Sequence, residues 1–274
     1  MSPAGERVWA PEPLPAPALD SHCHLDLIDA PAAEVVAAAN AVGIARLVTV
    51  GVDLATSRWS AECADSYESV YAAVAVHPNE TARAAADPAG ADSVLAGIEA
   101  LARLPRVRAV GETGLDYYRD YADPGTQRDW FRAHIGIAKR TGRALMIHDR
   151  DAHDDVLRIL AEEGPPEHVV FHCFSGDARM AKQCADAGYV MSFAGNVTFS
   201  NAQPLRDAAA AAPAELILVE TDAPFLTPVP HRGRPNTPAM VAHTLRFLAD
   251  LKQVGLSDLC ELVTATAQRV FGPW

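Results

Sequence analysis

The sequence predicts a single-domain (β/α)8 TIM barrel, and three observations support this prediction. Short apolar runs rich in Val, Ile and Leu alternate along the chain with longer amphipathic stretches. Eight such runs occur within 274 residues, a length that suits one closed barrel. The sequence contains neither a GxGxxG dinucleotide pattern nor a GxxxxGK[ST] phosphate loop, which argues against an open doubly wound sheet. We therefore expect parallel strands covered by helices.

The apolar runs have the composition of strands that are buried on both faces. The expected strands are Ala18–Ser21, Ala45–Val52, Val70–His77, Val107–Glu112, Ala144–His148, His168–His172, Tyr189–Phe193 and Leu216–Thr221. Apolar residues at helical spacing predict helices between and after them. The expected helices are Pro31–Val42, Asp92–Leu104, Pro124–Arg140, Asp151–Glu163, Thr237–Leu251 and Leu256–Phe271. We expect the last of these to pack over the outside of the barrel.

The first 18 residues contain five prolines and lack the apolar centre of a signal peptide. We interpret residues 1–18 as a flexible or surface-hugging extension and residues 19–274 as the barrel domain. No apolar stretch approaches the roughly 18 residues that a membrane span requires. The five cysteines are scattered and form no CxxC pair, as is typical of a reducing compartment. These features predict a soluble, cytoplasmic protein.

The formal net charge of −12 argues against a broad basic surface for nucleic acid. Nucleic acid would then bind only through metal ions and a few local arginines.

Side chains that bind divalent metals follow the apolar runs. His22 and His24 are two residues apart in an extended segment, so their side chains point to the same side and can hold one ion together. Glu112, His148, His172 and Asp222 each stand at the end of another run. Because the active site of a (β/α)8 barrel lies at the C-terminal ends of the strands, these six residues should meet there.

A single histidine at a strand end is as often a hydrogen-bonded core residue as a ligand. That interpretation does not explain why five of the ten histidines, with His77 as the fifth, occupy one rim. The remaining five stand in helical, loop or strand-start positions, and we expect no metal role for them; they are His134, His153, His168, His231 and His243.

Glu112 is the best-placed residue to bridge two metal ions. Glycines at 111 and 114 let the backbone turn and let ligands approach closely. Many barrel hydrolases with two metals bridge them through a carbamylated lysine, but no lysine stands at a strand end of this chain. A carboxylate must therefore serve as the bridge.

Several segments resemble the signature blocks of the TatD-type metal-dependent hydrolases. They are Asp20-Ser21-His22-Cys23-His24, Gly111-Glu112-Thr113-Gly114-Leu115-Asp116-Tyr117, Ile147-His148-Asp149-Arg150-Asp151-Ala152, His172-Cys173-Phe174-Ser175-Gly176, Glu220-Thr221-Asp222-Ala223-Pro224 and Arg232-Gly233-Arg234-Pro235-Asn236 with Pro238. The resemblance runs from about Leu19 to Phe271, and the joint occurrence of the blocks is highly specific. It implies a (β/α)8 barrel, a divalent-metal centre and deoxyribonuclease activity.

The resemblance also implies a division of the ligands between two metals. His22, His24, Glu112 and Asp222 would hold one ion, and Glu112, His148 and His172 the second. In Val76-His77-Pro78-Asn79-Glu80 the chain departs from the family, which often has a second histidine after the proline. His77 keeps its expected role, whereas a contact from the position after Pro78 is in doubt.

Residues beside the ligands are open to more than one interpretation. Arg150 follows His148 by two, and either contacts a phosphate or pairs with Asp149, Asp151 or Asp116. Asp26 and Asp116 either orient ligand imidazoles or serve as loop and cap residues. Three tyrosines after the fourth strand could stack on bases, but we favour lid packing for them; they are Tyr117, Tyr118 and Tyr121. Strand alternation predicts that Cys23 and Cys173 are core thiols pointing away from the site.

The function that these residues predict is hydrolysis of DNA phosphodiester bonds by a two-metal mechanism, preferentially on single strands or ends. Asp222 would orient or deprotonate the attacking water beside Glu112, while His77 and Arg150 would hold phosphate. The ligand types leave Mg, Mn and Zn open. We expect DNA as the partner, with no membrane and no obligate protein partner. The alternatives are an ester or amide hydrolase, such as an aminoacyl-tRNA deacylase or amidohydrolase, and a non-catalytic metal-dependent binding protein.

Overall fold

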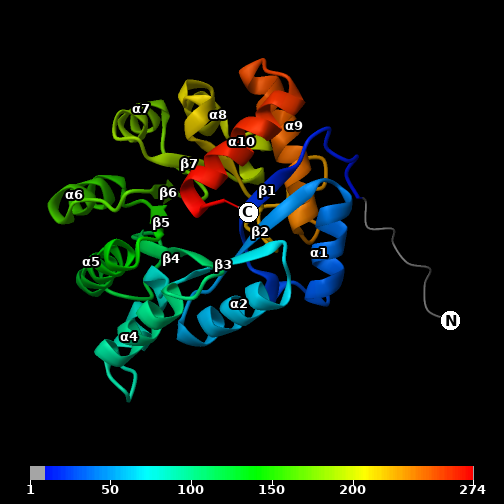
Figure 1. Ribbon diagram of the computed structural model, residues 1–274. Coiled ribbons are helices and arrows are strands. Elements are labelled where there is room, and N and C mark those ends of the chain that lie inside the picture. Colours follow the sequence, from blue (N-terminus) through cyan, green and yellow to red (C-terminus); the bar gives the residue numbers. More distant parts are fainter. Residues whose placement is uncertain (1–9, 274) are drawn as a thin grey trace.

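The computed structural model describes residues 10–273, and over these residues eight parallel strands form one sheet in sequential order with helices outside it (Figure 1). The strands are β1 (Ala18–Cys23), β2 (Ile44–Val50), β3 (Val70–Val74), β4 (Val107–Asp116), β5 (Ala144–Arg150), β6 (Val169–Phe171), β7 (Val190–Phe193) and β8 (Ile217–Val219). Every neighbouring pair is parallel because a crossover with at least one helix joins each strand to the next. The predicted (β/α)8 barrel is confirmed.

The α-helices are α1 (Ala32–Ala41), α2 (Leu54–Ser66), α3 (Thr81–Ala85), α4 (Ala91–Ala102), α5 (Pro124–Thr141), α6 (His153–Glu163), α7 (Ala178–Asp186), α8 (Gln203–Ala211), α9 (Val241–Lys252) and α10 (Leu256–Phe271). Short 3-10 helices are η1 (Leu25–Leu27), η2 (Pro78–Glu80), η3 (Gly195–Thr198), η4 (Ala214–Leu216) and η5 (Pro238–Met240). The predicted helices all exist. The one expected from Thr237 begins as η5, since Pro238 occupies its first position, and continues as α9.

The barrel closes where the first strand meets the chain after the last one. The Asp222 N–H donates to the His22 carbonyl at 2.9 Å, and the His24 N–H donates to the Ala223 carbonyl at 2.8 Å. The Asp20 carboxylate accepts from the backbone N–H of Thr221 at 2.9 Å and also from its hydroxyl. These bonds satisfy buried polar groups along the seam, and they bring the ligands of β1 beside Asp222.

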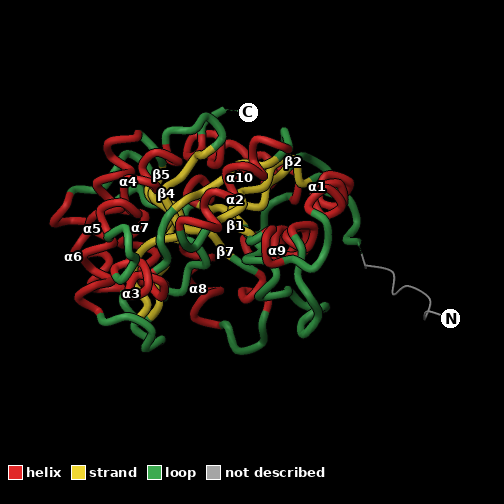
Figure 2. Tube along the Cα trace, turned by 90° about the horizontal axis from the view of Figure 1, so that it is seen from below, coloured by secondary structure: helices red, strands yellow, loops and turns green. Residues whose placement is uncertain are grey.

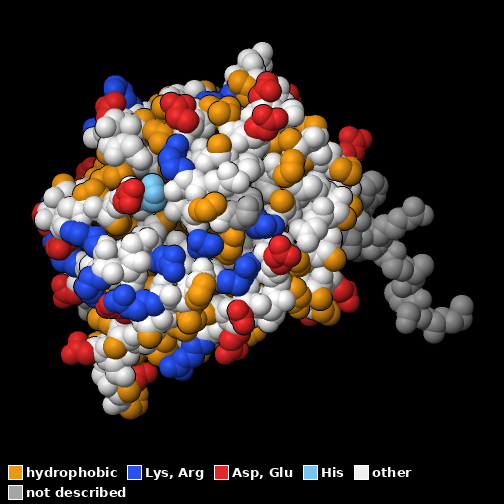
Figure 3. All heavy atoms as spheres, viewed as in Figure 1, with side chains coloured by type: hydrophobic (Ala, Val, Ile, Leu, Met, Phe, Trp, Pro, Cys, Tyr) orange, Lys and Arg blue, Asp and Glu red, His pale blue; other side chains and the backbone are white. Residues whose placement is uncertain are grey.

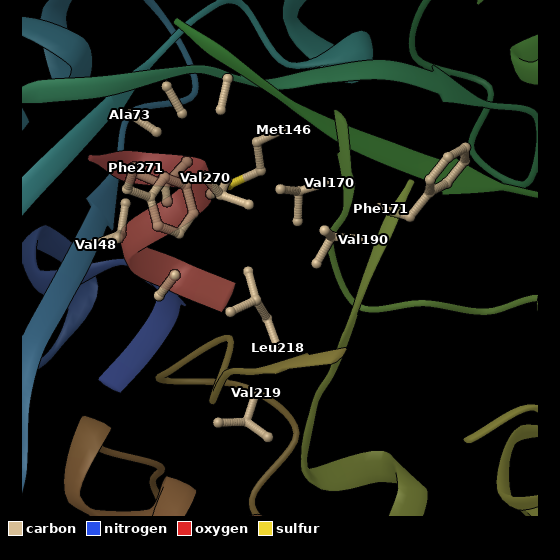
Figure 4. Packing of buried hydrophobic residues seen from close by; sticks show 14 of the residues in the cluster. Val48, Ala73, Met146, Val170, Phe171, Val190, Leu218, Val219, Val270 and Phe271 are labelled. Carbon is tan, nitrogen blue, oxygen red and sulfur yellow. The ribbon is translucent and has the colours of Figure 1, made fainter. Parts of the chain in front are cut away.

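The end of α10 covers one end of the barrel interior. Val270 and Phe271 lie among residues that point inward from the strands, including Val48, Ala73 and Met146 (Figure 4). All of these side chains are buried, so the last helix fills the bottom of the core rather than only its outside. In Figure 2 the end of α10 lies at one edge of the molecule, and long loops fill the opposite edge.

Strands β4 and β5 are longer than the sequence predicted. Their pairing continues past Glu112 and His148, with Gly114 opposite His148 and Asp116 opposite Arg150. The predicted strand ends at Glu112 and His148 were therefore wrong. The backbone pairing of β4 with β5 continues through polar residues, beyond the point where the apolar pattern stops.

Two glycines permit this close pairing. A Cβ at position 111 would lie 2.4 Å from the Met146 Cβ, and one at position 114 would lie 2.1 Å from the His148 carbonyl oxygen. Gly114 also has a φ of +136°, which L side chains rarely adopt. A register shift between Val110 and Thr113 places Glu112 in an irregular part of β4.

The described part of the Pro-rich segment, residues 10–17, lies against the body of the barrel. The Leu14 N–H donates to the Val42 carbonyl at 3.0 Å, and Arg246 donates to the Glu12 carbonyl at 2.6 Å. Residues 1–9 fall outside the described residues, so the extension expected over 1–18 and the division after residue 18 remain predictions. Over residues 10–273, no helix has the length and apolar character of a membrane span.

Candidate metal centre

The six predicted metal ligands meet at the C-terminal end of the strands, around a cavity of about 740 Å³. Their elements are spread around the barrel: the end of β1 for His22 and His24, β4 for Glu112, β5 for His148, and the turns after β6 and β8 for His172 and Asp222. His77, which follows β3, lies in the same group. The barrel thus joins residues that are far apart in the sequence.

One half of the cluster consists of two imidazoles and two carboxylates. His22 Nε2 and His24 Nε2 are 3.2 Å apart. Glu112 Oε2 lies 3.5 Å from His22 Nε2, and Asp222 Oδ1 lies 3.5 Å from His24 Nε2. These four atoms come from the four residues that the family resemblance assigns to one ion, and they converge on one small volume.

The other half surrounds the second oxygen of Glu112. Glu112 Oε1 lies 2.6 Å from His148 Nδ1, 2.7 Å from His172 Nε2 and 3.3 Å from His77 Nε2. The two oxygens of one carboxylate therefore face two different groups of imidazoles. His77, which the sequence suggested as a phosphate contact, forms a group of possible ligands with Glu112 and His148.

His172 belongs to both halves. Its ring stacks on that of His22 with centroids 3.9 Å apart, and it groups with His22 and Asp222 as well as with the second oxygen of Glu112. The resemblance assigned His172 to the second ion alone, whereas in the structure it also lies beside the ligands assigned to the first ion.

Hydrogen bonds on the far side of the rings fix the orientation of three imidazoles. His24 Nδ1 lies 3.0 Å from the Val50 carbonyl oxygen, so it carries the proton and leaves Nε2 free to bind a cation. His172 Nδ1 lies 3.1 Å from Glu220 Oε1, and His22 Nδ1 lies 3.1 Å from Met146 Sδ. The sequence reasoning missed the role of Glu220, although it stands in the same block as Asp222.

Charge within the cluster shifts the pKa of its members. Burial alone would raise the pKa of Glu112, but the charges of His172 and His77 and hydrogen bonds from His148 and His172 hold this pKa well below its usual range. Burial opposes protonation of His24, yet the hydrogen bond to Asp222 and its charge raise the pKa of His24 to about 9. The carboxylates thus hold protons on the neighbouring imidazoles. A cation can bind to the same nitrogen and oxygen atoms by displacing those protons.

His148 provides a second sign that the donor set fits a metal, because its two ring nitrogens face different groups. Its Nδ1 atom lies 2.6 Å from Glu112 Oε1 in the cluster, while its buried Nε2 atom lies 3.3 Å from Asp116 Oδ2. A ring that is held through Nε2 presents Nδ1 to a cation. Asp116 is buried beside it, which favours the interpretation that this residue orients a ligand imidazole.

The backbone is strained at two residues of the site. Asp222 has a φ of 54° and Cys173 a φ of 41°, values that residues other than glycine seldom adopt. The hydrogen bond from the Asp222 N–H to His22 holds the first, and a bond of 2.9 Å from the Cys173 N–H to Glu220 Oε1 holds the second. Cys23 is a core thiol as predicted, but this turn places Cys173 on the cavity wall, so the prediction for Cys173 was wrong.

Arg150 lines the cavity, and its guanidinium lies over the Tyr118 ring with Cζ 3.9 Å from the centroid. Within residues 10–273 it makes no ion pair with Asp149, Asp151 or Asp116, which removes the salt-bridge alternative. Tyr117 is packed, since its hydroxyl donates to Asp155 at 2.6 Å. Lid packing was the wrong expectation for Tyr118 and Tyr121, which are 61% and 62% exposed.

Over the described residues, the other five histidines belong to none of these groups. His134 is nonetheless important for the site, because it accepts from the Val76 N–H at 3.2 Å and its other nitrogen lies 2.9 Å from the Thr113 hydroxyl. These two partners adjoin His77 and Glu112. No sequence pattern distinguished His134 from an ordinary helical histidine.

Known proteins resemble the chain over nearly its whole length. A Mycobacterium tuberculosis protein described as an uncharacterized metal-dependent hydrolase TatD is 45% identical over 93% of this chain and 97% of its own length. Escherichia coli YcfH, described in the same terms as a metal-dependent hydrolase, is 37% identical over 92% of this chain and 95% of its own. The crystal structure of the E. coli TatD homolog YjjV superposes with a TM-score of 0.85 at 26% identity, covering 94% of this chain and 98% of that one.

The barrel, the cluster at its catalytic end and these relatives define a metal-dependent hydrolase. Within this class, residues 19–272 match the family model described as TatD related DNase. The chain belongs to the TatD family, and the resemblance found in the sequence is confirmed.

Proposed function

We propose that the protein hydrolyses phosphodiester bonds of DNA, from an end, with two divalent metal ions. The observation that carries this proposal is the position of Glu112, whose two carboxylate oxygens face two separate groups of imidazoles. Pairs of metal ions bridged by one carboxylate are typical of enzymes that stabilise both the attacking and the leaving oxygen of a phosphoryl transfer.

The residues present fit such a centre. His22, His24, Asp222 and Glu112 Oε2 would hold one ion, and His148, His172 and Glu112 Oε1 the other, with His77 next to the second. When bound, the ions would polarise the phosphoryl oxygens and lower the pKa of water. The five imidazoles favour Zn or Mn, whereas the carboxylates also suit Mg.

Residues of the chain would position the substrate and move the proton. Asp222 is held at its place by the bond from its N–H to His22, and its side chain faces the cavity. Although burial opposes it, the hydrogen bond from His24 and the charges of His22 and His172 lower the pKa of Asp222, so this carboxylate is ionised and able to accept a proton. Arg150 lines the same cavity, pairs with no acidic side chain among residues 10–273, and would hold a phosphate there.

The substrate class is tested by one set of parallel reactions. The protein is stripped with a chelator, reconstituted separately with Mg, Mn or Zn, and incubated with end-labelled single-stranded DNA, duplex DNA, RNA and an aminoacyl ester. We expect shortening of single-stranded DNA from an end, and shortening that is slower by about 100-fold or more with Asp222→Asn, which controls for contaminating nucleases. Turnover of the ester with no cleavage of any nucleic acid would reject the proposal in favour of the deacylase alternative.

A further inference from the structure

We propose that an exposed ridge beside the metal cavity is a stacking subsite for an unpaired base, and that it selects single-stranded nucleic acid. The ridge consists of Tyr118, Arg119 and Tyr121 from the loop after β4, together with Arg150 at the end of β5. This inference rests on the proposed function, since it assigns the part of the substrate next to the cleaved bond.

Aromatic rings and guanidinium groups alternate along the tyrosine–arginine ridge. Arg150 Cζ lies 3.9 Å from the centroid of Tyr118, and Arg119 Cζ lies 5.9 Å from Tyr118 and 5.7 Å from Tyr121. Arg119 also donates to the Tyr121 hydroxyl at 3.3 Å. Both rings stay more than half exposed, so the ridge presents apolar faces and positive charge to solvent rather than burying them.

The loop that carries the ridge is held in place by two buried side chains. Asp116 Oδ1 accepts from the N–H of Tyr118 at 3.0 Å and from that of Arg119 at 2.9 Å. Gln127, from α5, joins the two ends of the loop by accepting from the Asp116 N–H at 2.8 Å and donating to the Ala122 carbonyl at 2.9 Å. A loop fixed in this way loses little further entropy when a ligand binds.

The ridge is continuous with the metal cavity. Arg119, Tyr121 and Arg150 line the same cavity as the metal ligands, and the Asp116 carboxylate that fixes the ridge also lies 3.3 Å from His148 Nε2. Leu27 and Phe225, 51% and 52% exposed, also line this cavity. A ligand whose phosphate lies at the ligands can therefore extend one of its neighbouring groups over the tyrosines.

A nucleobase is the group that this surface fits best. Bases stack on tyrosine faces without regard to sequence, and the arginines match the phosphates between them. In a duplex the bases already stack on one another, so only an unpaired strand can offer a face to the ridge. This explains how a chain of net charge −12 can bind a polyanion, because the positive charge is needed only here and at the metals.

The test compares Tyr118→Ala/Tyr121→Ala with wild type on a short single-stranded oligonucleotide and on bis(p-nitrophenyl) phosphate, a diester without bases. We expect KM for the oligonucleotide to rise about tenfold or more, a larger penalty than for the small diester, with kcat changed far less. Tyr118→Phe/Tyr121→Phe should restore KM, since phenylalanine keeps the stacking face. Leu104→Ala, an exposed apolar residue before β4, is the control for surface changes.

Oligonucleotides with an abasic site at each position in turn identify the stacked base. Wild type should lose affinity at one position, and the double alanine variant should show no further loss there. The proposed stacking role would be refuted by equal KM values for wild type and the alanine variant. It would also be refuted by an equal loss of affinity in both proteins at every abasic position. Binding to the Asp222→Asn protein, followed by fluorescence anisotropy, tests the ridge even if no substrate is cleaved. If only the proposed function fails, wild type will not cleave the oligonucleotide but will still bind it, and this binding will still depend on Tyr118 and Tyr121.

Discussion

At the scale of single residues, Glu112 joins the two halves of the cluster, because each half has one of its oxygens. We expect Glu112→Ala to lose both metals, since each set of ligands loses the carboxylate oxygen that this one residue provides to it. Elemental analysis after gel filtration gives metals per chain. Glu80→Ala is a matched control, because Glu80 lines the same cavity but pairs with Arg83. Two metals per chain in Glu112→Ala would refute the bridging role.

Asp222 allows chemistry to be separated from binding. Asp222→Asn keeps an oxygen and the side-chain volume but loses the negative charge and the capacity to accept a proton. We expect kcat to fall by about 100-fold or more, with oligonucleotide affinity largely retained. Steady-state kinetics and anisotropy measure the two quantities, and metal content is checked in the same samples. Near-full turnover by a variant that keeps its metals would contradict the role assigned to Asp222.

The sequence predicted the residues that form the cluster and suggested Asp116 as one that orients them, but it did not predict the roles of Glu220 and His134. His22, His24, Glu112, His148, His172 and Asp222 were identifiable because ligand types follow apolar runs in a barrel pattern. Glu220 and His134 act through hydrogen bonds to residues distant in the chain, and such bonds depend on the tertiary arrangement. Cys173 was misplaced because a positive φ breaks the strand alternation on which the prediction relied.

At the scale of elements, His134 of α5 connects this helix by hydrogen bonds to β4 and to the turn after β3. Its Nε2 accepts from the Val76 N–H, so its proton lies on Nδ1, which donates to Thr113. Burial lowers the pKa of His134 to about 4, so the neutral ring is the form that the folded protein contains. This element therefore gives the stability of the fold a dependence on pH.

The folded pKa of His134 lies below the unfolded value of about 6.5, so its contribution is complete above pH 6.5 and is lost as pH falls towards 4. We expect wild type to lose on the order of 2 kcal/mol more stability than His134→Gln between pH 7.5 and pH 5. Urea unfolding with a chelator present measures this difference, while titrations common to both proteins cancel. Parallel pH profiles of the two proteins would show that His134 is not the titrating group.

Element boundaries were predicted well where the apolar pattern and the hydrogen-bonded ladder end together. The limits of α10 match the prediction, since Gly255 and Gly272 flank its apolar stripe. Strands β4 and β5 exceed it because Gly111 and Gly114 let polar segments stay paired. The helix pattern also could not show that α10 would fill the bottom of the barrel, which depends on the shape of the opening between strands.

At the scale of the whole molecule, one face carries many basic side chains (Figure 3). Lys and Arg side chains gather on the face crossed by α10, opposite the metal centre (Figure 3). At that end Arg106 donates to the Val70 carbonyl at 2.7 Å and Arg143 to the Ala102 carbonyl at 2.8 Å, so both help to tie elements together. The overall net charge is −12, and we expect DNA to bind weakly without metal.

A cavity of about 740 Å³ at one end of a barrel admits a flexible strand more readily than a rigid duplex. We therefore predict that covalently closed duplex circles survive under conditions in which linear single strands are digested. Gel electrophoresis of both substrates in one reaction measures the two rates, and a circle cut once by a restriction enzyme is the control. Rapid nicking of closed circles with slow digestion of ends would contradict an end-directed enzyme.

The seam of the barrel has a consequence for the order in which the protein is made. Asp20 and Thr221, which hydrogen-bond across it, are 201 residues apart in the sequence. During translation His22 and His24 leave the ribosome long before Asp222, and α10 emerges later still to fill the space beneath Met146. A chain that stops before β8 would carry Glu112 and the five imidazoles of the cluster, yet its first and seventh strands would remain open edges ready to pair with other chains. We therefore expect stable metal retention only from a polypeptide that has been synthesised through its last helix.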